Sequence, residues 1–277
     1  YGSNDTTIVF EIEDALAGFK SALQYSINAN SMLYVSISKG YKSGGINQNP
    51  YLSLTNRNYQ PEYNWNYETG FKTYTNNMQS QLTLFYMNRE DQQVNISSQQ
   101  EEGNPNTFYF YTANATTGYN FGMEFEHTFN ITDDLKMFYN IGYLNTNVDA
   151  YEFKTNDVHT VTLGDREQAQ APNYTYSYGL NYKYPFGITL SCEVSGKDEF
   201  YFSDSHNMKS EKYQILNASW RYDYKSFSVI GWSKNILDER YAIRGFYFGL
   251  EPPNYEDKLY VQWADPVQYG MTLKYQF

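Results

Sequence analysis

The amino-acid sequence predicts an all-β fold, an antiparallel up-and-down transmembrane β-barrel wall of about 11 strands. Three observations predict it: an aromatic-rich composition, a two-residue alternation of apolar and polar side chains, and connections that alternate between short and long. Aromatic residues make up 19% of the 277 residues, with 31 Tyr, 18 Phe and 4 Trp, whereas the mean hydropathy is only -0.69. Such a composition favours strands over a large helical domain.

The alternation is clearest in residues 173–184 and recurs at the end of the sequence. One face of the first segment carries Tyr174, Tyr176, Tyr178, Leu180, Tyr182 and Tyr184, and the other carries Thr175, Ser177, Gly179, Asn181 and Lys183. The last segment alternates Tyr269, Met271, Leu273, Tyr275 and Phe277 with smaller or polar residues. Similar registers predict strands within residues 19–27, 65–71, 82–86, 119–129, 135–143, 188–194 and 216–222, and two extended segments of ambiguous register lie around 33–37 and 227–236.

Every other connection between these segments is a tight turn, at residues 28–31, 76–77, 132–134, 185–187 and 223–225. The intervening connections are long, roughly residues 44–62, 97–107, 149–172, 201–209 and 238–265. This order predicts a meander whose long loops all lie at one end, as in outer-membrane barrels.

The charged residues indicate which face would meet lipid. Lys20, Glu68, Lys72, Glu124, Glu126, Lys136, Lys183, Glu193, Arg221 and Lys274 all fall on the polar face. A Lys or Arg facing lipid at mid-membrane costs roughly 2–4 kcal/mol, so we expect the polar face to line the lumen. A soluble Tyr-rich sheet, such as a lectin sandwich or a propeller, is the alternative that this pattern leaves open.

Composition also excludes several classes of function. The net charge of -11 leaves no electrostatic footprint for nucleic acid. Cys192 is the single cysteine, so the sequence holds no intrachain disulfide and no cysteine cluster for zinc or iron–sulfur. No apolar run reaches the roughly 18–20 residues of a membrane helix. Because Tyr1 is neither a Met start nor part of a signal peptide, we expect the interior and end of a longer protein.

Four sequence motifs carry a resemblance to a known family. The motifs are, in sequence order, residues 38–47 (SKGYKSGGIN), 61–72 (PEYNWNYETGFK), 234–241 (KNILDERY) and 265–270 (DPVQYG). The last of them precedes a final strand that ends in an aromatic residue. In this order they resemble segments of TonB-dependent outer-membrane receptors, over most of the chain.

The resemblance implies a 22-stranded barrel with a plugged lumen, of which residues 1–277 would be the C-terminal part of the barrel domain. The plug and the first barrel strands would then lie outside this chain. It further implies contact with outer-membrane lipid, with the barrel-assembly machinery, and with the TonB complex through the missing N-terminal part. The alternative is a passive porin-like channel of about twelve strands, completed by residues 6–14.

No catalytic constellation is recognisable, and we expect no enzyme. Asp204, Ser205 and His206 are triad residue types, but sequence neighbours do not form a triad. We expect no cofactor and no protein-bound metal, so that a metal would arrive only within a bound chelate.

Ligand recognition is predicted in the long loops, because rings and guanidinium groups suit planar chelates with anionic groups. The candidate ligand-binding residues are Tyr51, Arg57, Tyr59, Tyr109, Tyr111, Arg166, Tyr201, Arg244, Tyr247 and Tyr255. Together with the resemblance they predict import of a scarce ligand, a ferric siderophore first, with cobalamin or a glycan as alternatives. A soluble carbohydrate-binding β-protein is the third hypothesis. The resemblance also implies that Tyr269, Met271, Leu273, Tyr275 and Phe277 form the barrel-assembly signal.

Overall fold

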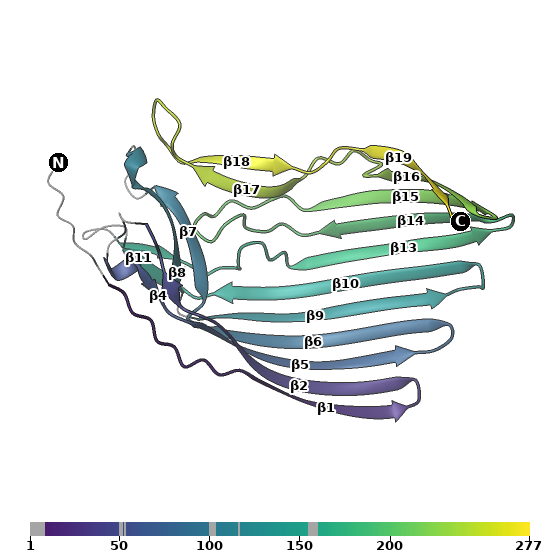
Figure 1. The fold of residues 1–277 in the computed structure, drawn as a ribbon, viewed down its shortest axis with the longest axis horizontal. Helices are drawn as coiled ribbons and strands as arrows, with labels where there is room; N and C mark the ends of the chain where they lie inside the picture. Colours follow the sequence, from purple (N-terminus) through teal and green to yellow (C-terminus); the bar gives the residue numbers. More distant parts are fainter. Residues whose placement is uncertain (1–8, 50–51, 53, 100–103, 116, 155–159) are drawn as a thin grey trace.

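The main body of the protein is one curved antiparallel sheet of 11 strands, shown in Figure 1. The structure is a computed structural model that describes residues 9–49, 52, 54–99, 104–115, 117–154 and 160–277. The strands of the sheet follow one another in sequence order: β1 (Phe19–Asn28), β2 (Ser31–Lys42), β5 (Glu62–Tyr74), β6 (Met78–Glu90), β9 (Thr117–Asn130), β10 (Leu135–Val148), β13 (Tyr174–Tyr184), β14 (Ile188–Lys197), β15 (Tyr213–Tyr224), β16 (Phe227–Lys234) and β19 (Gln268–Tyr275). The predicted all-β meander of 11 strands is therefore confirmed.

The five predicted tight turns join β1 to β2, β5 to β6, β9 to β10, β13 to β14, and β15 to β16. All of them lie at one end of the sheet, on the right in Figure 1, and the long connections lie at the other. Phe186, Gly187 and Lys225 adopt positive φ angles within two of these turns, as tight hairpins require.

Four of the long connections contain small hairpins of their own, which the sequence analysis did not resolve. They are β3 (Gly45–Ile46) with β4 (Asn58–Tyr59), β7 (Gln93–Gln99) with β8 (Phe108–Asn114), β11 (Tyr151–Lys154) with β12 (Thr160–Leu163), and β17 (Ala242–Phe248) with β18 (Lys258–Trp263). Two short 3-10 helices, η1 (Leu54–Asn56) and η2 (Pro105–Thr107), complete the loops. The predicted loop at 97–107 was too short, because β6 ends at Glu90 and the next alternating segment leaves the main sheet to pair as β7 and β8.

Strand register places the alternating apolar residues of neighbouring strands on one face of the sheet, while a few rings such as Phe138 and Tyr34 lie on the polar face. Tyr178 pairs with Tyr139 and Val194, so their side chains share a face. Lys183 lies on the opposite face, where it pairs with Thr189, which in turn pairs with Arg221. The predicted division of residues 173–184 between two faces is confirmed.

The polar face is the one over which the long loops fold. Thr146 and Val148, both on the polar side of β10, are buried beneath loop residues. The backbone N–H of Gln168 donates to Thr146 Oγ1 at 3.0 Å. The loops therefore lean over the polar face, as expected for side chains that line a lumen.

The sheet does not close on itself within the described residues. β1 and β19 lie at its two edges, and residues 9–18 form no strand that would extend it. The predicted twelfth strand at 6–14 is thus not seen in its described part, and residues 6–8 lie outside the described residues. Among the helical segments described, none is long and apolar enough to span a membrane.

Candidate functional site

Side chains from several long loops pack into a common core above the polar face. Its members come from the loop after β2, the β7–β8 hairpin, the end of β10 and β11, and are Leu52, Val94, Ile96, Tyr111, Ala115, Val148 and Tyr151. Val94 and Ile96 are only 1% exposed. Because side chains from several separate segments bury one another here, these loops form a folded body of their own.

A second, smaller core joins the loop between β14 and β15 to the β17–β18 hairpin. It contains Phe200, Phe202 and Ala242, with Leu259 and Val261 packed against them. Gly245 lies directly against Phe202, and a Cβ there would be 2.6 Å from two ring carbons. This close approach fixes the hairpin on the loop below it.

Residues 203–206 connect the two cores and contact three neighbouring loops. The backbone N–H of Asn95, in β7, donates to Asp204 Oδ2 at 3.3 Å. Arg166 Nη2, in the loop after β12, donates to the carbonyl oxygens of Ser203 at 2.8 Å and Asp204 at 2.6 Å. His206 stacks on Tyr247 of β17, with ring centroids 3.6 Å apart and planes 8° apart. We call residues 203–206 the hub segment.

Burial shifts the titration of the two ionisable groups in the hub segment. Burial raises the pKa of the Asp204 carboxyl, against the opposing effects of the Asn95 N–H and the Arg166 charge. Burial lowers the pKa of the His206 imidazole, although Asp257, whose Oδ2 is 3.8 Å from Nε2, favours the charged form. Both groups are therefore poised toward their neutral forms by the packing of the loops.

A buried polar group lies beside the hub segment. Tyr151 Oη and Arg166 Nη1 are buried and have no hydrogen-bond partner in the part of the chain that the structure describes. Burial raises the pKa of Tyr151, and the charge of Asp204 adds to that rise. Other groups of the protein hold the Arg166 side chain. Its Nη2 donates to two carbonyl oxygens, and its guanidinium carbon lies 4.2 Å from the centroid of the Tyr201 ring.

An exposed aromatic ridge lies where the β7–β8 and β17–β18 hairpins meet. Phe108 contacts Phe248 at 6.1 Å between ring centroids, and Phe246 stacks on Tyr260 at 5.6 Å. Phe110 is 65% exposed, and Arg244 is exposed on the same hairpin as Phe246. We call these residues the loop ridge: Phe108, Phe110, Phe246, Phe248, Tyr260 and Arg244. Phe110, Phe248 and Tyr260 were missed by the sequence analysis, although the alternation within residues 108–114 could have indicated Phe110.

The structure disperses the predicted ligand-binding residues. Tyr109 packs against the loop core, and Tyr111 is buried within it. Arg166 and Tyr201 contact each other, and Lys209 lies on the Tyr201 ring at 4.4 Å. Tyr247 stacks on His206. These side chains support the loops, and their part in binding stays a prediction.

The remaining predicted residues lie at the edges of the loop body. Arg57 Nε donates to the Leu52 carbonyl oxygen at 3.3 Å, and the ring of Tyr59 covers Gly45. Tyr255 is partly exposed and adopts a positive φ angle near the tip of the β17–β18 hairpin. Tyr51 lies outside the described residues. Arg244 is the predicted residue that the structure places on the exposed loop ridge.

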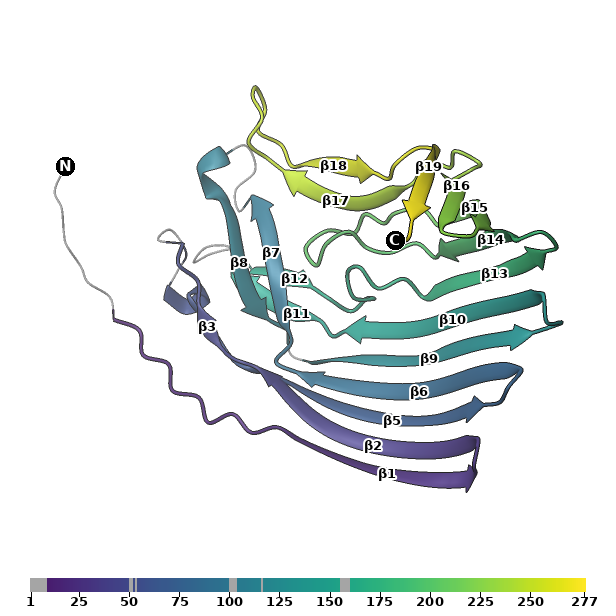
Figure 2. The same ribbon diagram turned by 45° about the vertical axis from the view of Figure 1, so that its right-hand side comes forward.

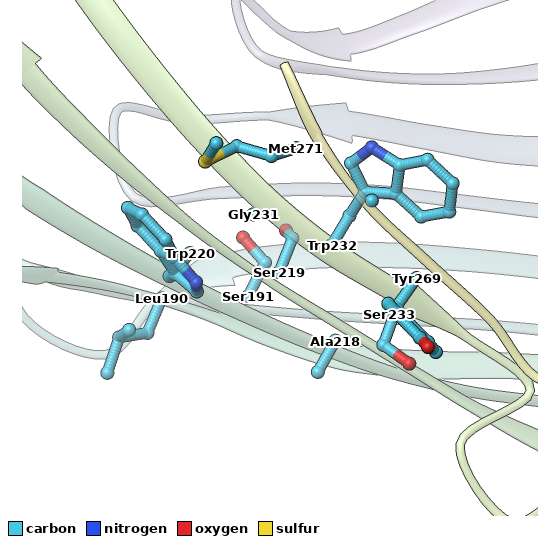
Figure 3. Close-up of a pocket in the computed structure, with 11 residues that line it drawn as sticks. Leu190, Ser191, Ala218, Ser219, Trp220, Gly231, Trp232, Ser233, Tyr269 and Met271 are labelled. Carbon is cyan, nitrogen blue, oxygen red and sulfur yellow. The ribbon is translucent and has the colours of Figure 1, made fainter. Parts of the chain in front are cut away.

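A large hollow lies away from the loops, on the apolar face (Figure 3). It has a volume of about 810 Å³ and is lined by residues of β14, β15, β16 and β19. The small residues Ala218, Gly231 and Ser233 leave space between Trp220 and Tyr269, because register places all of them on the apolar side of the sheet. The hollow belongs to the surface predicted to face lipid, and none of its lining residues carries a charge. No group of three or more His, Cys, Asp or Glu side chains that could hold a metal occurs among the residues described.

The comparisons with known proteins agree with this geometry. The family described as "TonB dependent receptor-like, beta-barrel" matches residues 14–236, which include most of the sheet and four of the five long connections. The chain belongs to this family. The family consists of transport receptors and not of enzymes.

Solved structures of TonB-dependent receptors share the fold. The chain is similar to the ferric yersiniabactin uptake receptor FyuA from Yersinia pestis, with 18% identity, a TM-score of 0.73, and coverage of 93% of this chain and 37% of that one. The siderophore receptor PiuA from Acinetobacter baumannii has 14% identity, a TM-score of 0.71, and coverage of 92% and 35%. The copper transporter OprC has 10% identity, a TM-score of 0.69, and coverage of 93% and 39%. The chain thus spans little more than a third of each solved receptor.

The last strand of this TonB-dependent receptor barrel has an exposed apolar side. Tyr269 is 83% exposed, Leu273 is 72% exposed, and Phe277 follows the end of β19 fully exposed. Met271 and Tyr275 share that side of the strand. The arrangement is compatible with a strand read by an assembly machinery, and this role of the five residues stays a prediction.

Proposed function

We propose that this chain forms part of the wall of a bacterial outer-membrane receptor that imports a ferric siderophore with energy supplied through TonB. The observation that carries the proposal is the loop body, in which loops from successive hairpins are tied together above the polar face of a receptor barrel sheet. Such a body presents a binding surface at the entrance of a lumen. Two of the similar solved proteins are named as receptors for siderophores or their ferric complexes.

The loop ridge supports a planar, ring-containing chelate as the ligand. Phe110 and Phe246 offer exposed rings, and Arg244 offers a cation beside them. Stacking contributes about 0.5–1.5 kcal/mol per ring, and cation–π contacts add comparable amounts. The iron would arrive inside the chelate as cargo, and the protein would need no resident metal. OprC is named a copper transporter, so the fold alone does not determine the ligand. Cobalamin and a glycan are the alternative ligands that the test includes.

The proposal includes the membrane and the partners. The apolar face of the sheet, with its row of tyrosines, would contact outer-membrane lipid, since aromatic rings favour membrane interfaces. The remaining barrel strands and the plug would complete the receptor, and the TonB complex would act through the plug side. The acidic chain would bind no nucleic acid.

The test is uptake by the full-length receptor in a strain that lacks its other iron receptors. We expect growth on one or more ferric siderophores and loss of that growth when TonB is removed. Growth that persists without TonB would identify a passive channel instead. Uptake of labelled cobalamin or of a glycan, without growth on any ferric siderophore, would show that the receptor imports a different ligand. The proposal of active transport would still hold.

A further inference from the structure

The long connections carry almost all of the negative charge of the chain. Five connections join the strands of the sheet at the loop end: residues 43–61, 91–116, 149–173, 198–212 and 235–267. Together they contain 18 Asp and Glu but only 8 Lys and Arg. Their net charge is therefore -10, out of -11 for the whole chain. The negative charge is thus concentrated at one end of the sheet, where a ligand would enter.

Several cations of these loops are held by groups of the loops themselves. Lys209 Nζ lies between Glu167 and Glu199, at 2.9 and 3.2 Å from their carboxylate oxygens. Lys258 Nζ lies 3.7 Å from a carboxylate oxygen of the same hairpin. Arg166, which was expected to meet a ligand, donates to two backbone carbonyl oxygens instead. These contacts leave few loop cations free to offset the carboxylates.

Exposed carboxylates outnumber exposed cations in the described part of these loops. The exposed carboxylates that form no ion pair with a described residue are Asp91, Asp165, Glu211, Asp238, Glu239, Glu256 and Asp265. The corresponding exposed cations are Lys212, Arg240 and Arg244. A surface that carries mainly one sign of charge raises the local concentration of ligands of the opposite sign. The loop end therefore attracts a cation and repels a polyanion.

The loop ridge supplies groups that hold a cation at short range. Phe110 and Phe246 are 65% and 49% exposed, and the face of an aromatic ring attracts an ammonium group. Glu251 lies beside Tyr260 of the ridge and raises the pKa of its hydroxyl through a hydrogen bond. Rings and a carboxylate thus occur together on the β17–β18 hairpin, and Arg244 can donate to oxygen atoms of the same ligand.

We propose that the ligand is a ferric chelate with a net positive charge, in which chelating groups of one negative charge each neutralise the iron and a free ammonium group remains. The proposal rests on the proposed function, since it names the class of chelate that the same loops receive. Three hydroxypyridinone groups neutralise Fe³⁺ and are planar rings, so one ammonium group gives the complex a charge of +1. Three catecholates leave a complex of similar shape at -3. The loops attract the first complex and repel the second.

The test measures binding of three complexes that share one ferric tris-hydroxypyridinone core to the full-length receptor. A free amine gives the complex a charge of +1, its acetylation gives 0, and its succinylation gives -1. We expect the association rate constant to fall in that order, by roughly tenfold from first to last at low salt. The difference should shrink to less than about twofold in 0.5 M NaCl, where the Debye length is about 4 Å.

Matched charge reversals assign this preference to the loops. Glu211→Lys/Glu256→Lys reverses two exposed carboxylates of the loop end and should reduce the preference for the +1 complex several-fold. Asp133→Lys/Asp134→Lys changes the net charge equally in the β9–β10 turn, at the opposite end of the sheet, and should keep the preference. Both variants are first shown to remain heat-modifiable barrels.

Three results would overturn the proposal. The first is equal or faster association of the -1 complex at low salt. The second is growth on any ferric siderophore, a triscatecholate included, through a receptor that does not bind the +1 complex. The third is an equal loss of preference in the two charge-reversal variants. Each of these leaves import of a ferric siderophore intact. Import of cobalamin or a glycan without binding of any ferric chelate would refute this inference and the siderophore ligand together.

Discussion

The ring of Phe138 covers Gly179 across the pair formed by β10 and β13, and a Cβ at Gly179 would lie 2.7 Å from two of its ring carbons. The same relationship recurs on the polar face between Tyr34 and Gly70, where the Tyr34 hydroxyl also donates to Glu68 Oε1 at 2.7 Å. In both pairs a ring fills the place that the glycine leaves empty, which packs the inner side of a curved sheet.

We therefore expect Gly179→Ala to destabilise the barrel by about 1–3 kcal/mol, because the ring of Phe138 and the Cys192 carbonyl oxygen, which lies 2.5 Å from that Cβ, must both shift. The measurement is the urea midpoint of the heat-modifiable band of the full-length receptor. Gly40→Ala is the matched control, since a Cβ at Gly40 has no atom within 4 Å. Equal midpoints for the two variants would show that the close packing around Gly179 does not contribute to the stability of the barrel.

Asp204 is expected to hold the loops together through its acceptor oxygens more than through its charge. Asp204→Ala removes the acceptor of the Asn95 N–H, which should cost about 0.5–1.5 kcal/mol in local loop stability. Asp204→Asn keeps an acceptor and removes a charge that burial already disfavours. Limited proteolysis within residues 198–212 should thus be faster in the alanine variant and nearly unchanged in the asparagine variant. Faster cleavage of both would assign the role to the charge.

The packing of residues 198–212 should weaken as the pH falls below the ordinary pKa of histidine, about 6.5. Burial lowers the pKa of His206 in the packed loops, so the unpacked state binds more protons and gains stability in acid. Burial raises the pKa of Asp204 above the ordinary carboxyl range, so protonation of Asp204 acts in the opposite direction. The comparison between pH 7.5 and 5.5 is therefore also made in Asp204→Asn, in which this titration is absent.

Hydrogen exchange of residues 198–212 measures this effect. Exchange should accelerate from pH 7.5 to 5.5 after correction for the intrinsic rate. His206→Phe keeps a ring against Tyr247 and removes the titration, so it should abolish the acceleration. A parent protein without acceleration would mean that Asp257 compensates the charged imidazole fully.

The loop ridge should contribute to ligand binding without contributing to the barrel. Replacing Phe110 and Phe246 with alanine and Arg244 with glutamine should weaken binding of the imported chelate by about 2–3 kcal/mol, from two rings and one cation. The barrel should remain heat-modifiable. Phe186→Ala serves as the comparison, because Phe186 is an exposed ring in the tight turn at the opposite end of the sheet. If both variants bind as the parent does, the ligand contacts another part of the receptor.

The strands and their faces could be predicted because each follows from a local rule. Tyr174 to Tyr184 alternate in the sequence, and the register of β13 with β14 keeps that alternation across the sheet. The turn at 185–187 follows from the local preferences of Pro and Gly. Figure 2 shows the resulting strands side by side, with the short turns at one end.

The loop body could not be predicted in the same way, because it depends on contacts between distant segments. Arg166 looked like a free cation for a ligand, yet its partners are Ser203 and Asp204 in another loop. Tyr111 looked like an exposed ring, yet Val94 and Tyr151 enclose it in the loop core. No periodicity in the sequence indicates which loops will meet, so the binding role of these residues could not be separated from a packing role.

Active transport by the receptor that contains this chain requires TonB. The most direct measurement is uptake of iron-55 supplied as a ferric siderophore by cells that carry the full-length receptor as their sole iron receptor, with and without TonB. We expect saturable uptake that falls to background when TonB is absent, while binding of the chelate to the cells persists. Uptake that is equal with and without TonB would contradict it.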